Sequence, residues 1–235
     1  MGIKIRTYLI TLLTIAFVSC GNDIKNQQVK KNETQKEAVK KDTVVPQKKV
    51  AEFKLTSDNA LEFFFNYNKT LKENKVKLTT NLGSFTIKLF DNVPYHKSNF
   101  IYLTKKGYFD NTYFHRVVKN FIIQGGNTDL RATSKKRRKI GKYLLPPDTK
   151  KGYKHHRGII SMPSSEIENA FKMASPYEFF IVVQKPGAYH LDKEYTPFGK
   201  VIEGMNIVDK INSVDTDSGD WPKQNVYILK AEVVK

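Results

Sequence analysis

The chain has 235 residues and a formal net charge of +17, from 40 Lys or Arg against 23 Asp or Glu. This length suits one substantial domain with extensions, and the excess positive charge predicts attraction to anionic surfaces without indicating a fold. Cys20 is the sole cysteine, which excludes an intramolecular disulfide and a metal–thiolate centre.

Residues 1–20 have the pattern of an export signal. Lys4 and Arg6 precede an apolar run over residues 8–18, which is too short to predict a membrane span. The run ends at Phe17-Val18-Ser19-Cys20-Gly21, which resembles the cleavage site of a bacterial lipoprotein. We therefore expect Cys20 to become the lipidated first residue of a protein anchored in the bacterial cell envelope, in the periplasm or on the outer surface. Secretion with an incidental cysteine is the alternative.

Two segments separate this signal from the main domain. Residues 21–52 are rich in Lys, Gln, Asn, Glu and Val without an apolar period, so they predict a flexible tether. Residues 57–73 repeat apolar side chains at helical spacing, with Ser57 or Asp58 as the expected N-cap. We expect this N-terminal helical extension, residues 53–75, to pack on the following domain; a protein-binding helix is the alternative.

From residue 76 onward, short β-rich segments dominate. Residues 76–80 and 84–90 predict a hairpin around Asn81-Leu82-Gly83. Helices are expected over residues 94–106, opened by Pro94 and followed by Gly107, and over residues 204–212. Further strands are expected over residues 159–162, 178–183, 198–202 and 226–234. Many short strands with two helices favour a closed antiparallel barrel, which leaves no sheet edge.

Residues 109–126 carry the most informative pattern in the chain. Short apolar pieces bounded by Asp-Asn, Lys-Asn and Gly-Gly predict two strands joined by a tight turn. Arg116 lies among aromatic and aliphatic residues of this segment. Burying a charge is costly unless it meets a partner, and Arg offers a rigid planar fork of donors. This cation is therefore a candidate functional residue.

The same segment reads Phe109-x-x-Thr112-x-Phe114-His115-Arg116-x-x-x-x-Phe121-x-x-Gln124-Gly125-Gly126. It resembles the signature of cyclophilin-type peptidyl-prolyl cis-trans isomerases. Later blocks resemble this family in the same order: Gly158-Ile159-Ile160-Ser161-Met162, Phe179-Phe180-Ile181, Leu191-Asp192 and Phe198-Gly199-Lys200-Val201-x-x-Gly204-Met205-x-x-Val208. The resemblance spans residues 76–235. It implies a mainly β fold, a closed eight-stranded antiparallel β-barrel capped by two helices, here with the extra N-terminal helix.

The resemblance also implies a reaction, rotation about an X–Pro bond against a barrier of roughly 20 kcal/mol. No bond is broken, so we expect no nucleophile, metal or cofactor. Arg116 is the expected catalytic donor, with a structural salt bridge as the alternative. The substrate-binding residues implied by the resemblance are Phe121, Ile122, Gln124, Phe180, Leu191 and Tyr195, with core packing as the alternative for the apolar ones. We interpret His115 as a core residue with a satisfied hydrogen bond.

Several positions depart from the family pattern. Pro163 and Ser164 replace a frequent Ala-Asn, His190 replaces a frequent Trp, and residues 166–173 lengthen a loop. Glu178 replaces a usual Gln, and an acid placed near Arg116 is able to pair with it and weaken it as a donor. These departures bear on substrate range and rate rather than on the fold.

Residues 127–157 contain eleven Lys or Arg and two Asp, a net charge of +9. Residues 131–142 lie where the family usually carries a Gly- and Thr-rich loop. One interpretation is a solvated loop with counterions, and the other is contact with an anionic surface. Nucleic-acid binders usually interleave stacking aromatics, and Tyr143 and Tyr153 give little support for that partner.

The sequence leaves more than one function open. The first hypothesis is a lipid-anchored prolyl isomerase that assists the folding of exported proteins and acts on their proline-containing segments. The second is a catalytically weak binding module or chaperone of the same fold for proline-containing or anionic partners. A structural envelope protein is the third. Retention of Arg116, Phe121, Gln124 and Phe180 favours the enzyme.

Overall fold

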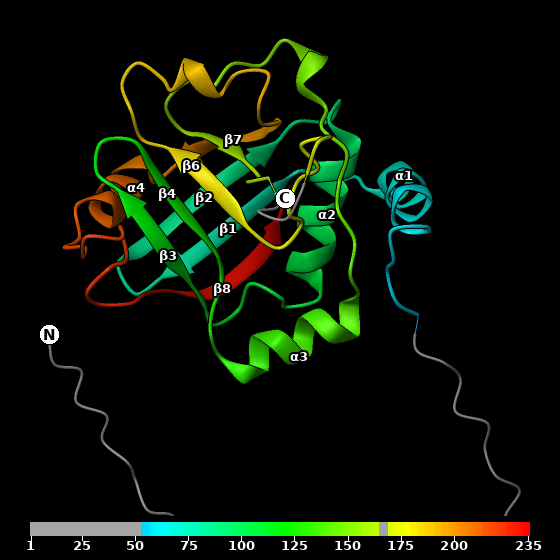
Figure 1. Ribbon diagram of the computed structural model, residues 1–235, viewed down its shortest axis with the longest axis horizontal. Coiled ribbons are helices and arrows are strands. Elements are labelled where there is room, and N and C mark those ends of the chain that lie inside the picture. Colours follow the sequence, from blue (N-terminus) through cyan, green and yellow to red (C-terminus); the bar gives the residue numbers. More distant parts are fainter. Residues whose placement is uncertain (1–52, 165–168) are drawn as a thin grey trace, which may run out of the picture. The chain divides into compact units, whose positions relative to one another are not determined.

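The computed structural model describes residues 53–164 and 169–235, and in this part eight strands form a closed barrel accompanied by four α-helices (Figure 1). The strands are β1 (Lys75–Thr80), β2 (Gly83–Leu89), β3 (Thr112–Val118), β4 (Ile122–Asn127), β5 (Ile159–Ser161), β6 (Phe179–Val182), β7 (Pro197–Glu203) and β8 (Val226–Val234). They pair antiparallel in the order β1-β2-β7-β5-β6-β4-β3-β8. The expected barrel is confirmed. The predicted signal, the tether and Cys20 lie outside the described residues.

The side chains that point inward from the strands fill the barrel. In β1 the side chains of Val76 and Leu78 are buried, and in β2 those of Phe85, Ile87 and Leu89 are buried. Successive side chains of a strand point to opposite faces, so one set faces the interior. The largest fully buried side chains are aromatic, among them Phe100, Phe109, Phe114, Phe179 and Phe198. This apolar interior fixes the strands that carry the candidate site.

Helices α2 (Pro94–Lys105) and α4 (Met205–Asn212) pack against different strands, at the two ends of the barrel (Figure 1). Pro94 stands in the first turn of α2, as predicted. Gly204 precedes α4 with φ 75°, and a Cβ there would lie 2.5 Å from the Ser84 carbonyl oxygen. Only glycine fits this approach. Both helices were expected from the sequence.

Helix α1 (Ala60–Thr70) packs on α2, as the extension was predicted to do. Phe64 is fully buried, its ring lies 5.9 Å from that of Tyr102, and its carbonyl accepts a hydrogen bond from Ser98 Oγ at 3.2 Å. The expected N-cap is wrong, because the helix starts from Asn59. The Asn59 Oδ1 accepts the Thr56 N–H at 2.8 Å, which orders the preceding turn.

Helix α3 (Arg131–Ile140) occupies the basic segment, so the expectation of a loop there is wrong. Thr128 Oγ1 accepts the Leu130 N–H at 3.0 Å and fixes the turn before the helix. Lys136 Nζ then donates to the carbonyls of Gly107 (2.7 Å) and Asp110 (2.8 Å). Lys and Arg have good helix propensity, and these tertiary bonds hold one side of the helix on the barrel.

No helix in residues 53–164 or 169–235 is long and apolar enough to cross a bilayer. Within the same ranges, no group of three or more His, Cys, Asp or Glu side chains is placed to hold a metal ion.

Candidate active site

A groove of about 670 Å³ crosses the face of β3 and β4. Its lining residues are His115, Arg116, Gln124, Asn127, Pro163, Ser164, Ser175, Glu178, Tyr195 and Trp221. The predicted catalytic residue Arg116 and two of the predicted substrate-binding residues, Gln124 and Tyr195, are among them. The exposed Trp221 was missed by the sequence analysis, because it lies beyond the matched blocks and reaches the groove only through the fold.

The strand register brings three predicted residues into one row. Arg116 of β3 pairs with Gln124 of β4, and Gln124 pairs with Phe180 of β6. Residues opposite each other in paired strands share a face of the sheet. A guanidinium, an amide and an aromatic ring therefore stand side by side across three strands.

A small apolar cluster lies at the Phe180 end of this row. It contains buried Ile122, Phe180, Val182 and Ala188, with Val118, Phe121, Leu191 and Tyr195 packed against them. The Phe180 and Tyr195 rings meet edge to face at 5.4 Å, and Phe121 stacks on His190 at 5.3 Å. The five residues predicted to bind substrate besides Gln124 thus belong to one cluster. An apolar surface beside polar groups is the usual form of a small-ligand site.

Arg116 pairs with Asp220, so the pairing with Glu178 that the sequence left open is not formed. Arg116 Nη2 lies 3.3 Å from Asp220 Oδ2, and the two side chains are 43% and 38% exposed. An exposed ion pair of this kind contributes about 0–1 kcal/mol. The guanidinium is therefore held in the groove without being committed to a buried partner.

Glu178 is the centre of a separate polar network. Its carboxylate accepts hydrogen bonds from Gln124 Nε2 and Asn127 Nδ2, each at 3.1 Å. His115 Nε2 lies 3.5 Å away and Arg137 Nη2 of α3 lies 3.7 Å away. Burial alone would raise the pKa of Glu178, but the bonds from His115 and Gln124 and the charge of Arg137 outweigh it and lower that pKa.

His115 differs from its interpretation as a satisfied core residue. Its side chain lines the groove, its Nδ1 has no hydrogen-bond partner among the described residues, and its ring centroid lies 6.1 Å from that of Trp221. The neighbouring departures Pro163 and Ser164 also line the groove. Of the lengthened loop, residues 166–168 are outside the described part.

Behind the apolar cluster lies an arrangement that the sequence analysis missed. His155 Nδ1 is 2.8 Å from Asp192 Oδ1, its Nε2 is 3.0 Å from Ser161 Oγ, and its ring stacks on Phe180 at 6.2 Å. Burial lowers the pKa of His155 despite the neighbouring carboxylate. Ser161 is 0% exposed and cannot meet a substrate as a nucleophile. His155, held by Asp192 and Ser161, therefore supports the Phe180 ring by stacking on it.

Comparison with known proteins agrees with this geometry. The family described as cyclophilin type peptidyl-prolyl cis-trans isomerase/CLD matches residues 75–233. Peptidyl-prolyl cis-trans isomerase-like 2 of Rhizopus delemar is 36% identical over 171 residues, which cover 72% of this chain and 30% of that protein. Peptidyl-prolyl cis-trans isomerase CYP18-2 of Arabidopsis thaliana is 35% identical over 162 residues, 68% of this chain and 93% of that protein.

A solved structure has the same fold. The cyclophilin type peptidyl-prolyl cis-trans isomerase of Cryptosporidium parvum superposes with a TM-score of 0.58 at 28% identity, covering 69% of this chain and 98% of that one. A second crystal structure of that protein was obtained in the presence of the dipeptide ala-pro.

These matches and the barrel define the class, and the chain belongs to the cyclophilin-type peptidyl-prolyl cis-trans isomerase family. It is an enzyme of that activity, a peptidyl-prolyl cis-trans isomerase.

Proposed function

We propose that this isomerase turns X–Pro bonds of exported proteins, with Arg116 as the donor that stabilises the twisted amide. The row formed by Arg116, Gln124 and Phe180 carries this proposal. It puts a permanent cation next to an amide that can hold a peptide backbone and next to an apolar cluster that can hold a proline ring.

The chemistry follows from amide resonance. When the X–Pro bond twists, resonance is lost and the proline nitrogen regains a lone pair. A donor close to that nitrogen stabilises the twisted state more than either planar isomer, and only such a difference accelerates a reaction. Arg116 remains charged at any physiological pH, and no covalent intermediate or proton transfer is needed.

The surroundings of Arg116 suit this role. The side chains of Phe121, Phe180 and Leu191 form an apolar surface on which the pyrrolidine ring can pack. Gln124 keeps its carbonyl oxygen for the substrate, because its Nε2 donates to Glu178. Glu178 is compensated by its own partners, which leaves the donor capacity of Arg116 for the substrate.

The cellular role rests on the N-terminal sequence. The lipoprotein-like site at Cys20 and the polar stretch over residues 21–52 support an enzyme tethered to the cell envelope, on the periplasmic or outer side. Proline-containing segments of exported polypeptides are the substrates that such a location would supply.

The peptide assay tests the enzymatic part of the proposal. The chain from residue 21 onward is mixed with a soluble Ala-Pro peptide, and the rate of cis-to-trans conversion is followed. We expect acceleration over buffer, and Phe180→Ala should lower kcat/KM about tenfold or more because the apolar surface for the pyrrolidine ring is lost. A wild-type rate equal to that of buffer would leave the binding module as the function.

That second candidate has one specific observation behind it. The carboxylate of Glu178 lies in the groove with the guanidinium of Arg116, so the groove carries charges of both signs for a binding surface to use. Tight peptide binding without turnover would favour it.

A further inference from the structure

We infer that the outer face of α3 is a second functional surface, which binds the anionic headgroups of a phospholipid bilayer. We call it the α3 basic surface; its exposed residues are Arg131, Lys135, Arg138 and Lys139 of the helix, with Lys54, Lys106 and Lys142 beside it. The inference deepens the proposed anchoring and does not depend on the isomerase mechanism.

Helical geometry sorts the residues of this segment into two faces. Within the helix, Lys135, Arg138 and Lys139 follow Arg131 at spacings of four, seven and eight residues, and Lys142 comes two residues after the helix ends. Residues at these spacings share one side of a helix. No Asp or Glu occurs between residues 130 and 147. The outer face therefore presents a stripe of one sign.

The opposite face fixes the helix on the barrel. Thr133 and Ile140 are buried, and Lys136 is bound by backbone carbonyls. Arg137 Nε donates to Tyr108 Oη at 2.9 Å, and its guanidinium lies 5.1 Å from the Tyr177 ring centroid. Two of the basic residues thus hold the helix in place, and the exposed ones are left to meet a partner.

Two hollows next to the helix are lined by basic and apolar side chains together. One, of about 530 Å³, has Lys54, Arg138, Lys142 and the partly exposed Leu144 among its lining residues. The other, of about 280 Å³, is lined by Phe53, Tyr102, Lys106, Lys136, Lys139 and Ile140. Lysine and arginine around an apolar surface are typical of contact with the headgroup region of a membrane.

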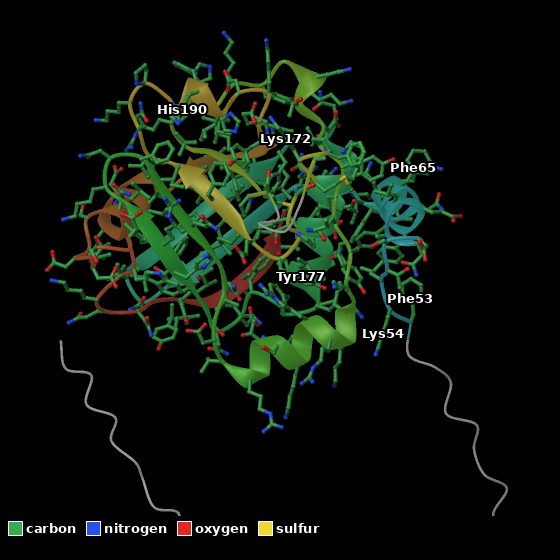
Figure 2. All side chains as sticks on the ribbon, in the orientation of Figure 1. Phe53, Lys54, Phe65, Lys172, Tyr177 and His190 are labelled. Carbon is green, nitrogen blue, oxygen red and sulfur yellow. The ribbon has the colours of Figure 1, made fainter. Side chains whose placement is uncertain are left out.

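The path of the chain supports the same partner. The described chain begins at Phe53, which is labelled in Figure 2 and has a side chain that is 57% exposed. Leu55 then pairs with Gly141 directly after α3. The first described residue therefore lies next to the α3 basic surface, and the proposed anchor at Cys20 precedes it in the sequence. Nucleic acid fits less well, because Tyr143 and Tyr177 are 3% and 7% exposed and present no face for stacking bases.

Vesicle co-sedimentation tests this surface without the anchor. Residues 21–235 lack the apolar run and keep every buried core residue of the described part, the first of which is Leu55. We expect this protein to bind vesicles of phosphatidylglycerol and phosphatidylcholine, to ignore phosphatidylcholine alone, and to be released by salt.

The decisive variant is Lys135→Glu/Arg138→Glu/Lys139→Glu, whose three native side chains have no ion pair with any described acid. We expect its partition onto anionic vesicles to fall about 100-fold or more. The matched control, Lys200→Glu/Lys210→Glu/Lys223→Glu, changes the net charge equally on exposed residues of β7, α4 and the loop after α4, and should retain most of the binding. A milder triple Gln variant at residues 135, 138 and 139, checked by thermal melting, should give an intermediate loss.

Three outcomes would overturn the inference. The first is that the protein binds neutral vesicles as well as anionic ones. The second is that the α3 variant and its control lose the same amount of binding. The third is that a single-stranded oligonucleotide displaces the protein from vesicles at a concentration below that of the lipid. Turnover of the soluble Ala-Pro peptide is measured on the same proteins. A failure of the isomerase proposal would therefore be seen separately from a failure of this surface.

Discussion

At the scale of single residues, the charges of Arg116 and Glu178 have different partners in the site. Glu178 contacts His115, Gln124, Asn127 and Arg137, whereas among the described residues Arg116 forms its ion pair with the exposed Asp220 alone. The side chain of Gln124 links the two groups, because it stands beside Arg116 in the register and donates to Glu178. Orientation of this amide is therefore the function that we assign to Glu178.

Replacement of Glu178 tests this role. In Glu178→Ala the Gln124 amide loses its acceptor, and we expect kcat/KM for an Ala-Pro peptide to fall about tenfold. Gln124→Ala should cost a similar factor, and the double variant little more than either, since the two residues act as a unit. Steady-state kinetics of the three variants measure this coupling. Fully additive losses would show that Glu178 acts independently of Gln124.

At the scale of elements, α1 is part of the core and not an appendage. The predicted helical spacing was right, and Phe64 fills a position against α2 with Tyr102 and Tyr143 around it. The neighbouring Phe65 points outward with 49% of its surface exposed. Two adjacent phenylalanines therefore offer a matched comparison, and the outward one, Phe65, is labelled on α1 in Figure 2.

We expect Phe64→Ala to lower the free energy of unfolding by about 3–5 kcal/mol, because it leaves a cavity in the core. Phe65→Ala should change it by about 0.5 kcal/mol or less. Urea denaturation of both variants gives the difference directly. Equal effects would mean that α1 does not share the barrel's cooperative core.

Helix α2 contains a buried group that links stability to pH. His96 is fully buried without a hydrogen-bond partner for either ring nitrogen among the described residues, and burial lowers its pKa from 6.5 to about 3. The unfolded chain binds a proton at higher pH than the folded one, so stability is lost as pH falls below about 6.5. At pH 5 this loss amounts to about 2 kcal/mol relative to neutral pH.

The variant His96→Phe removes this titration and should flatten that part of the pH profile. Thermal melting between pH 7.5 and 5 compares it with the wild type. A wild-type profile that His96→Phe leaves unchanged would show that other groups cause the acid sensitivity.

The sequence predicted most of what is local in this fold. The hairpin of β1 and β2, the helices α1, α2 and α4, and the row that includes Arg116 and Gln124 follow from periodicity and from the family pattern. Helix α3 was missed because its stripe is basic and not apolar, so hydrophobic periodicity gave no signal. Asp220 lies 104 residues from its partner Arg116, and only the closed barrel brings the two together.

At the scale of the whole molecule, the isomerase domain carries both the candidate active-site groove and the α3 basic surface. Arg137 of α3 contacts Glu178 of the groove on one side and faces Tyr177 on the other. The element that we propose to face the membrane therefore also contributes a charge to the site. Neither the isomerase activity nor the proposed membrane contact requires the other, and a different variant tests each of them.

The proposed anchor makes a prediction for the intact protein. Mass spectrometry of the N-terminus of the native protein should find acyl chains on Cys20, and Cys20→Ser should move the protein out of the membrane fraction. A mature protein that starts elsewhere without modification would contradict the lipoprotein assignment. The peptide activity of the domain should be the same in both forms, because Cys20 lies outside the isomerase domain.

The central claim concerns Arg116, and exchange measured by nuclear magnetic resonance on a bound Ala-Pro peptide tests it most directly. If the guanidinium stabilises the twisted amide, Arg116→Ala should slow exchange between the bound cis and trans forms about 100-fold or more. Peptide affinity should change by less than about threefold, and the melting temperature should hardly move. Unchanged exchange in Arg116→Ala, or a loss of affinity that accounts for the whole loss of activity, would contradict the account.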